Sequence, residues 1–403
     1  MKNKLILHII FLVPFVITVL NAQVLITYFV SESLAKAIAY GNVGLVLIGT
    51  AFLIKDKGPA SKTASLWIIY YLIYFSIGIL ASAKHYEQTS IMLSTIPFIY
   101  TIGFYYYLSH EEHRKIFGYV AIVAFLASCI ICIYWNSINF DLDRRSVNIY
   151  ADRAQGVYGD ANNMALATII CFVLIFKLFN PKQRLFKILK IVMLGTAAYS
   201  LLITFSNTGF MAFVVSLVIL NFKYLKGLRL LFGMLLLPLV YILLLNLNTL
   251  TAHLDLVGQQ RAKINNIVNI VSFNFDKVDD SGRSELQEKL KPYIYENPIV
   301  GNGIDFGISF QAHNTYMIVW ADAGIFALIF FLFMLGTYFL RALWSPPETR
   351  FFVLPILLAL YVFMLSLHSV INQPYIMALF IFLGYVIDIN TTLAKSSDIV
   401  TEN

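Results

Sequence analysis

The sequence has 403 residues, of which 59% are hydrophobic and only 13% carry a formal charge. An ordinary soluble domain has about 25% charged residues, so this composition excludes that class. The net charge of +7 comes from basic residues that stand singly or in small groups between apolar segments. They do not form the single basic patch of a nucleic-acid-binding protein, so we expect no nucleic acid partner. Cys129, Cys132 and Cys171 lie inside apolar segments, which excludes a disulfide framework.

The apolar segments predict an all-α protein that crosses a membrane many times. Each crossing needs about 20 apolar residues, because the helix must satisfy its own backbone hydrogen bonds across about 30 Å of hydrocarbon. About twelve segments meet this requirement. They are 5–23, 34–54, 65–83, 88–109, 116–135, 162–180, 187–205, 208–222, 229–247, 315–340, 351–369 and 373–388.

The basic residues predict the orientation. With the amino terminus in the cytoplasm, most of the 29 lysines and arginines fall in cytoplasmic segments, as the positive-inside rule requires. The even number of helices then places the carboxyl-terminal tail, 391–403, in the cytoplasm too. The first helix resembles a signal peptide, but Leu20-Asn21-Ala22 is a poor cleavage site and more spans follow, so we expect it to be retained.

We expect the chain to be divided into three parts before the carboxyl-terminal tail. Residues 1–247 contain nine helices, 248–312 form a large extracytoplasmic loop, and 313–390 contain the last three helices. A loop of this length should contain helices of its own. Residues 254–271 have apolar side chains at helical spacing, and Ser284-Glu285-Leu286-Gln287 resembles a capping box that opens a second helix. These amphipathic helices are predicted to lie on the outer membrane surface.

Half of the arginines lie on the predicted outer side, where topology gives no reason for positive charge. They are Arg144, Arg145, Arg153, Arg261 and Arg283. Arginine binds phosphate and carboxylate groups in a planar, bidentate way, so these residues could hold an anionic substrate. The alternative is that they pair with nearby acidic residues such as Asp160. Both interpretations stay open from the sequence.

His313 is the candidate general base, at the start of the tenth predicted helix. A histidine with a pKa near neutrality can take a proton from a hydroxyl group. Successive helical residues turn by about 100°, so Gly324 falls on nearly the same face as His313 and is predicted to open a channel beneath it. Asp322 falls on the opposite face, which excludes a His–Asp relay within this helix.

One combination of motifs resembles the signature of the bacterial O-antigen ligase and O-antigen polymerase family. It consists of Glu296-Asn297-Pro298-Ile299-Val300-Gly301-Asn302-Gly303, then His313-Asn314-Thr315 and Ala323-Gly324, with Arg283 in the preceding loop. The resemblance implies transfer of a glycan from undecaprenyl diphosphate to a sugar hydroxyl at the outer face of the bacterial plasma (inner) membrane. It also implies an inverting displacement without metal or cofactor. The acceptor would be lipid A core for a ligase and a growing glycan for a polymerase.

The resemblance also implies roles for individual residues. His313 would take the proton of the acceptor hydroxyl, and Arg283 would hold the diphosphate leaving group. The candidate substrate-binding residues that accompany them are Arg261, Arg153, Arg145, Arg144, Asn207, Asn314 and Gly324.

Asn207 is a departure from the family pattern, which usually has Ser-Arg where this chain has Ser206-Asn207. Another arginine could substitute, with Arg153 or Arg145 as first choices. The diphosphate could instead be bound differently, or the activity could be weak or absent, which would leave a structural assembly protein. A secondary transporter is the alternative from another class, since many have twelve helices. Transporters bury charge at the membrane midplane, however, whereas here the charges collect in one outer loop.

Overall fold

The computed structural model describes residues 2–82, 91–140, 153–224, 241–256, 258–278, 282–368 and 370–401, with the isolated residues 142, 227 and 238. Every regular element in these ranges is helical. The all-α prediction is therefore confirmed for the part of the chain that the structure describes.

The helices fall into two groups along the chain. The first group is α1 (Lys2–Val19), α2 (Ala22–Phe29), α3 (Glu32–Leu53), α4 (Lys62–Ser82), α5 (Ile91–Tyr107), α6 (Glu111–Ser137), η2 (Gly156–Tyr158), α7 (Ala161–Leu178), α8 (Arg184–Ile203), α9 (Asn207–Asn221) and η3 (Phe222–Tyr224). The second is α11 (Leu247–Leu250), α12 (Gly258–Val271), η4 (Phe275–Lys277), α13 (Arg283–Glu296), η5 (Phe306–Phe310), α14 (Thr315–Trp344), α15 (Pro347–Met364), η6 (Val370–Asn372) and α16 (Pro374–Thr401).

Seven of these helices are long and apolar enough to cross a membrane, and the number rises to eight if the bent pair α1 and α2 forms one span. Two shorter apolar helices occupy Asn207–Asn221 and Pro374–Asn390. The chain is thus a multi-pass membrane protein. Most of the predicted span 229–247 lies outside the described residues, and the total of twelve stays a prediction.

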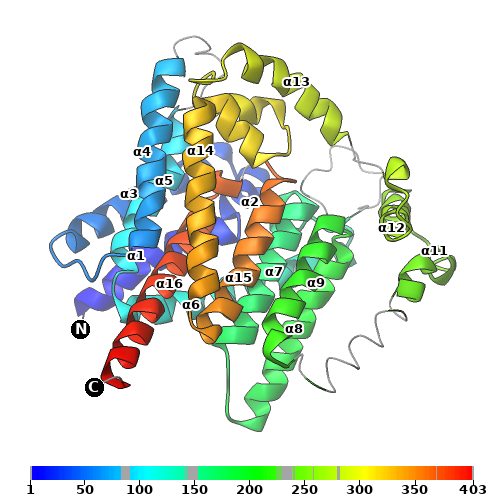
Figure 1. The fold of residues 1–403 in the computed structure, drawn as a ribbon, viewed down its shortest axis with the longest axis horizontal. Coiled ribbons are helices and arrows are strands. Elements are labelled where there is room, and N and C mark those ends of the chain that lie inside the picture. The colour runs from blue at the N-terminus through cyan, green and yellow to red at the C-terminus, as the bar shows by residue number, and fades with distance from the viewer. Residues whose placement is uncertain are drawn as a thin grey trace.

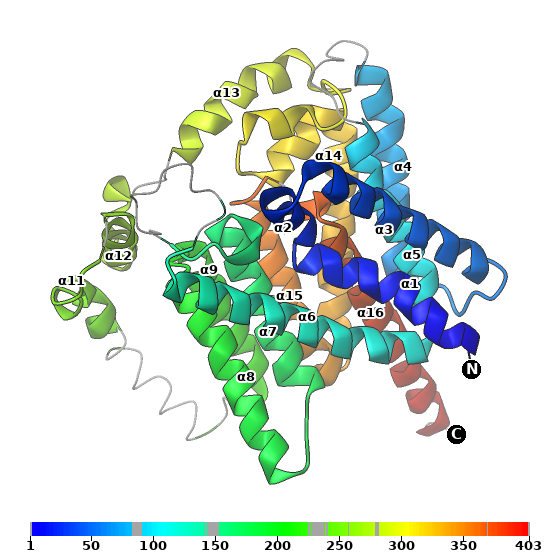
Figure 2. The ribbon, with the colours of Figure 1, turned by 180° about the vertical axis from the view of Figure 1, so that it is seen from behind.

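Helix α7 lies at the centre of the bundle. It is apolar on every side and buried over nearly its whole length, as expected for a helix enclosed by other helices. α6, α8, α9 and α15 pack around it, while α14 packs on α4 and α16 on α4 and α5 (Figures 1 and 2). Cys129, Cys132 and Cys171 are free and buried in this core, as the sequence predicted.

The first predicted span is broken rather than continuous. α1 and α2 meet at an angle of 64°. Asn21, at the bend, has a left-handed backbone with φ 46°, a conformation that ends a helix and that asparagine tolerates better than most residues. Its side-chain amide donates to the carbonyl oxygen of Val157 over 2.9 Å, which joins the bend to the turn before α7.

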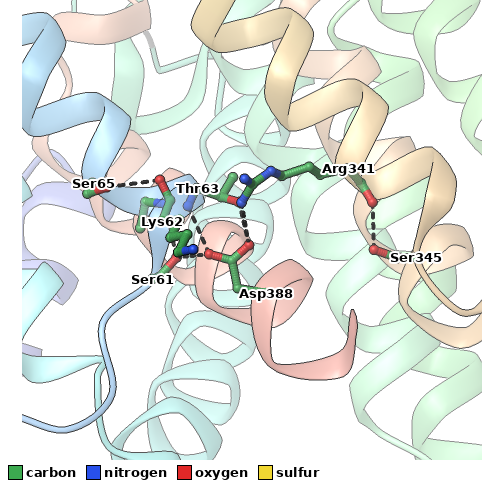
Figure 3. Close-up of polar contacts among 8 residues, drawn as sticks. Ser61, Lys62, Thr63, Ser65, Arg341, Ser345 and Asp388 are labelled. Carbon is green, nitrogen blue, oxygen red and sulfur yellow. Dashed lines mark hydrogen bonds and ion pairs between the residues drawn. The ribbon is translucent and has the colours of Figure 1, made fainter. Parts of the chain in front are cut away.

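A polar cluster joins the start of α4, the last turn of α14 and the middle of α16 (Figure 3). The carboxylate of Asp388 accepts hydrogen bonds from the Ser61 hydroxyl and the Thr63 amide, both at 2.8 Å, so it caps the start of α4. Arg341 of α14 donates to the same carboxylate over 3.1 Å. Because Asp388 of α16 accepts from an amide in the first turn of α4 and pairs with the charge of Arg341 in α14, it fixes three helices together.

Helices form in the segment 248–312 as predicted, but the predicted capping box does not. α12 occupies much of the predicted segment 254–271, and α13 lies across one end of the bundle, above the level of both chain termini in Figure 1. α13 begins at Arg283 after Gly282, which has φ 75° and makes no side-chain cap. The capping box at Ser284 therefore does not form, because the helix has already begun when Ser284 is reached.

Candidate active site around His313

The residues before α14 place His313 outside the helix. α14 begins at Thr315, and Asn314 is its N-cap, with a side-chain oxygen that accepts from the Met317 amide over 3.1 Å. His313 precedes the cap and has a left-handed backbone with φ 47°. Its position is therefore set by the turn before the helix, and the rotation of 100° per residue does not apply to it.

The predicted channel beneath His313 is wrong. Gly324 interrupts α14 with φ 76° and ψ −176°, so no single straight helix connects it to His313. A Cβ atom on Gly324 would lie 1.9 Å from the carbonyl oxygen of Ile299, so the space beside the glycine is filled by that backbone. The absence of a side chain at Gly324 allows a close approach of two backbones rather than an open path.

That approach forms a joint between the Pro298–Gly303 segment and the broken helix. The amide of Ile325 donates to the carbonyl of Pro298 over 2.9 Å, and the amides of Asn302 and Gly303 donate to the carbonyls of Ala321 and Asp322 over 2.8 and 3.0 Å. The break in α14 frees the carbonyls that these amides need. The signature residues between Pro298 and Gly324 thus form one structural unit.

The side chain of Asp322 makes its hydrogen bonds with residues other than His313. Its carboxylate is buried, and it accepts from the Tyr74 hydroxyl over 2.8 Å and from the Gly307 amide over 2.6 Å. The prediction that Asp322 makes no relay with His313 agrees with these contacts.

His313 lies beside a second histidine. The rings of His313 and His368 meet edge to face with 5.2 Å between their centroids. His368 follows α15, so the two residues come from the ends of neighbouring helices. The Nδ1 atoms of both rings are buried and have no hydrogen-bond partner among the described residues.

Charge interactions link the two histidines to Arg283 and Asp160, and these two residues to Arg153. The pKa of His313 is lowered by burial and by the charge of Arg283, and Asp160 opposes this shift. The pKa of His368 is lowered by burial and by His313, again against Asp160. The pKa of Arg153 is lowered chiefly by burial, and it responds to both Asp160 and Arg283. Arg283 and Asp160 are therefore close enough to act on the charge of His313, and Arg153 acts on Asp160 and Arg283.

Arg153 is held at the start of α9. Its Nε atom donates to the carbonyl of Thr204 over 2.9 Å, and Nη2 donates to Oδ1 of Asn162 over 3.3 Å. The hydroxyl of Ser206 donates to the same Asn162 oxygen over 2.7 Å. Arg153 thus shares a hydrogen-bond partner with Ser206, the residue just before Asn207.

The remaining candidates divide between those near the cluster and those elsewhere. Asn207 is the first residue of α9, and its Oδ1 atom is buried without a partner in the described part of the chain. Arg261 donates to Thr251 and Leu254 within its own loop, so its hydrogen bonds are local. Asn314 uses its side-chain oxygen to cap α14. Arg144 and Arg145 lie outside the described residues.

The sequence interpretation missed His368 and Asn162 and gave Asp160 no role beyond pairing with arginines. Asp160 is the N-cap of α7, where its carboxylate accepts from the Asn163 amide over 2.7 Å. A histidine at the end of the predicted span 351–369 was a usable signal, because ionisable residues at membrane boundaries are costly and often functional. No periodicity in the sequence predicts that His368 lies near His313.

This arrangement places a proton acceptor beside a cationic site. Histidine with a lowered pKa is neutral near pH 7 and can accept a proton. The guanidinium of Arg283, which acts on His313, and that of Arg153, which interacts with Arg283, can stabilise negative charge that develops in a reaction. In the described ranges, no group of three or more His, Cys, Asp or Glu side chains could hold a metal ion.

Comparison with known proteins bears on this site directly. Residues 192–332 match the family model described as O-Antigen ligase. Over these residues the chain is similar to the O-antigen ligase family. The resemblance seen in the sequence is thereby confirmed, and the matched segment includes Asn207, Arg283 and His313. Arg153, Asp160 and His368 lie outside it, so the cluster joins residues of the O-antigen ligase segment to residues on both sides of it. No curated protein matches the chain's sequence.

Proposed function

We propose that the protein transfers a glycan from undecaprenyl diphosphate to a sugar hydroxyl at the outer face of the bacterial plasma membrane. The observation that carries this proposal is the cluster around His313, where a histidine with a lowered pKa feels the charge of Arg283, and Arg283 in turn interacts with Arg153. A lipid diphosphate donor needs cationic stabilisation of its leaving group, and a sugar hydroxyl acceptor needs a base. The O-antigen ligase match supports the same class of reaction.

In the proposed reaction, His313 takes the proton of the acceptor hydroxyl as its oxygen attacks the anomeric carbon of the donor sugar. The bond from that carbon to the diphosphate oxygen breaks on the opposite face, so the configuration inverts. The electron pair leaves with undecaprenyl diphosphate, whose charge Arg283 and Arg153 stabilise. Arginine charge can serve here in place of a metal ion, so we propose a metal-independent reaction.

Arg153 is our proposed substitute for the arginine that the family usually carries at the position of Asn207. The shared contact with Asn162 supports this choice over Arg145. Asn207 would add an uncharged hydrogen bond to the diphosphate. The site then keeps two arginines despite the departure from the family pattern.

The proposed topology has twelve spans, with both termini in the cytoplasm and the 248–312 loop outside. It is supported by the Lys/Arg bias of the sequence and by the position of Asp160 at the site end of α7, with Lys177 in the last turn at the other end. The His313 cluster would then face the outer leaflet, where flipped lipid-linked glycans present their diphosphate.

Deletion of the gene, followed by electrophoresis of the surface glycans, tests this function. A ligase mutant should lose long glycan chains from the core and accumulate carrier-linked polymer, whereas a polymerase mutant should carry single repeats. An unchanged glycan pattern would contradict both forms of the proposal and favour the transporter alternative. Complementation with His313→Ala should reproduce the deletion pattern at normal protein levels.

A further inference from the structure

A polar cavity lies next to the His313 cluster but away from its arginines. It has a volume of about 410 Å³, and its lining includes Asn21, Gln23, Asn163, His368, Asn372 and Gln373. Asp160 lines it too, and no lysine or arginine does so among the described residues. Side-chain amides both donate and accept hydrogen bonds, which suits a ligand rich in hydroxyl groups rather than an anion.

The cavity has unused hydrogen-bonding capacity. The side-chain nitrogen of Gln373 donates to Oδ1 of Asn163 over 3.0 Å, which fixes the direction of the amide. Its other end, Oε1, is buried without a partner in the described ranges, as is Nδ1 of His368. Buried polar atoms are normally paired, so these two lining residues have hydrogen-bonding capacity that the described part of the protein does not use.

A second cavity of about 460 Å³ continues from the first. Thr18, Gln23, Asn372 and Pro374 line both, and Asp305 and Tyr100 lie at the far part. The bend between α1 and α2 falls at this place, because Thr18, Asn21 and Gln23 lie on its two sides. Non-helical backbone within a membrane protein is tolerated where it lines a polar cavity, so the cavity accounts for the bend.

We propose that this two-part cavity binds the acceptor saccharide as an uncharged chain of more than one sugar residue. The inference rests on the proposed glycan transfer. His368 lines the cavity and touches His313, so a hydroxyl of the sugar nearest His368 would reach the base. The donor diphosphate would approach from the side of Arg153 and Arg283, which do not line the cavity. The two substrates therefore meet at His313 from opposite sides.

The test measures saccharide binding separately from catalysis. The probe is the neutral core oligosaccharide released from the surface glycolipid of the deletion strain, and binding to the purified full-length protein is followed by saturation-transfer NMR. Gln23→Met and Gln373→Met keep the side-chain length but remove the amide. The matched control is Gln183→Met, because Gln183 is exposed before α8 and lines neither cavity.

We expect the probe to bind the wild-type protein and the control alike, with at least about tenfold weaker binding in either cavity variant, which corresponds to about 1.4 kcal/mol. In transfer assays the same variants should raise the acceptor KM and leave the donor KM unchanged. Probe binding that is absent in the wild type, or equal in all four proteins, would overturn the inference. If the probe binds as expected but no glycan is transferred, the proposed reaction fails and the saccharide site stands.

Discussion

His313 and His368 hold their rings edge to face, 5.2 Å apart, although 55 positions separate them in the sequence. The His313 ring feels the charge of Arg283, and the His368 ring lines the polar cavity. The pair therefore forms the boundary between the part of the site suited to an anion and the part suited to an uncharged sugar. The predictions below follow from this division and from the contacts that maintain it.

Replacement of His313 by alanine should lower the rate of glycan transfer by about 10² to 10⁴, the usual contribution of a general base. The measurement is the initial rate with purified protein, carrier-linked donor and acceptor. His253→Ala is the control, since His253 is an exposed histidine of the same loop. Full activity of His313→Ala at normal expression would show that another group takes the proton.

Replacement of Arg153 by alanine should lower the rate by about 10² to 10³, as loss of one transition-state donor does elsewhere. The double variant Arg153→Ala with Asn207→Arg should recover part of this loss, because it returns an arginine to the position that the family uses. Asn207→Arg alone, with Arg153 present, reports any harm from the new side chain. If the double variant is no more active than Arg153→Ala, the proposed substitution of one arginine for the other is incorrect.

The acid limb of the pH–rate profile should move to lower pH in Asp160→Asn. His313 must be neutral to accept a proton, and its pKa lies below the usual 6.5 because of burial and Arg283. The rate is thus retained above that pKa and lost as the pH falls through it. Asp160 raises this pKa, so removing its charge lowers the pKa further.

Asparagine caps a helix as well as aspartate does, so Asp160→Asn should keep the start of α7 intact. Equal thermal midpoints for the wild-type protein and the variant would confirm that the change in pH profile is electrostatic. An acid limb that stays in place or moves to higher pH would contradict the role given to Asp160.

Gly324→Ala should destabilise the protein by at least about 2 kcal/mol, because its backbone conformation is nearly exclusive to glycine. The added Cβ would also overlap the carbonyl oxygen of Ile299. Gly336→Ala is the control in the same helix, since a Cβ there meets no atom within 4 Å. The expected result is a lower thermal midpoint or reduced accumulation for the first variant alone. Equal thermal midpoints and equal accumulation of both variants would show that the backbones at Gly324 and Ile299 do not pack closely enough to exclude a Cβ atom.

Asp388→Ala should lower the free energy of unfolding by about 2 kcal/mol, because hydrogen bonds to a charged group are lost at Ser61 and Thr63. Arg341→Ala should cost less, since its side chain is 41% exposed and Asp388 keeps its other donors. Thermal unfolding in detergent compares the two. Transfer activity per folded molecule should be unchanged in both, and a larger effect of Arg341→Ala would contradict this account of the cluster.

The sequence interpretation was most successful where local pattern decides the structure. The apolar segments located the helices, and the signature residues located His313 and Arg283 in the segment that matches the O-antigen ligase family. Arg153 was named as a substitute, and the structure places it beside Ser206. The sequence did not place His368 and Asp160 near His313, because their distance from His313 depends on how α7, α14 and α15 pack.

The error at Gly324 has a similar cause. The rotation from His313 to Gly324 assumed a regular helix, but a left-handed residue precedes the helix and a glycine interrupts it. The break at Gly324 depends on the Pro298–Gly303 segment, which satisfies the backbone groups that the break exposes. A helical period cannot reveal a partner that lies elsewhere in the chain.

The joint at Gly324 also limits how the chain length can change. Gly303 is attached to Asp322, and Gly307 is attached to the side chain of the same residue, so both ends of this short stretch are bound to α14. An insertion between Gly307 and Asn314 would lengthen the segment that positions His313 before the start of α14. Relatives that perform the same chemistry should therefore conserve the spacing here, whatever their sugars, and vary in length elsewhere in the loop.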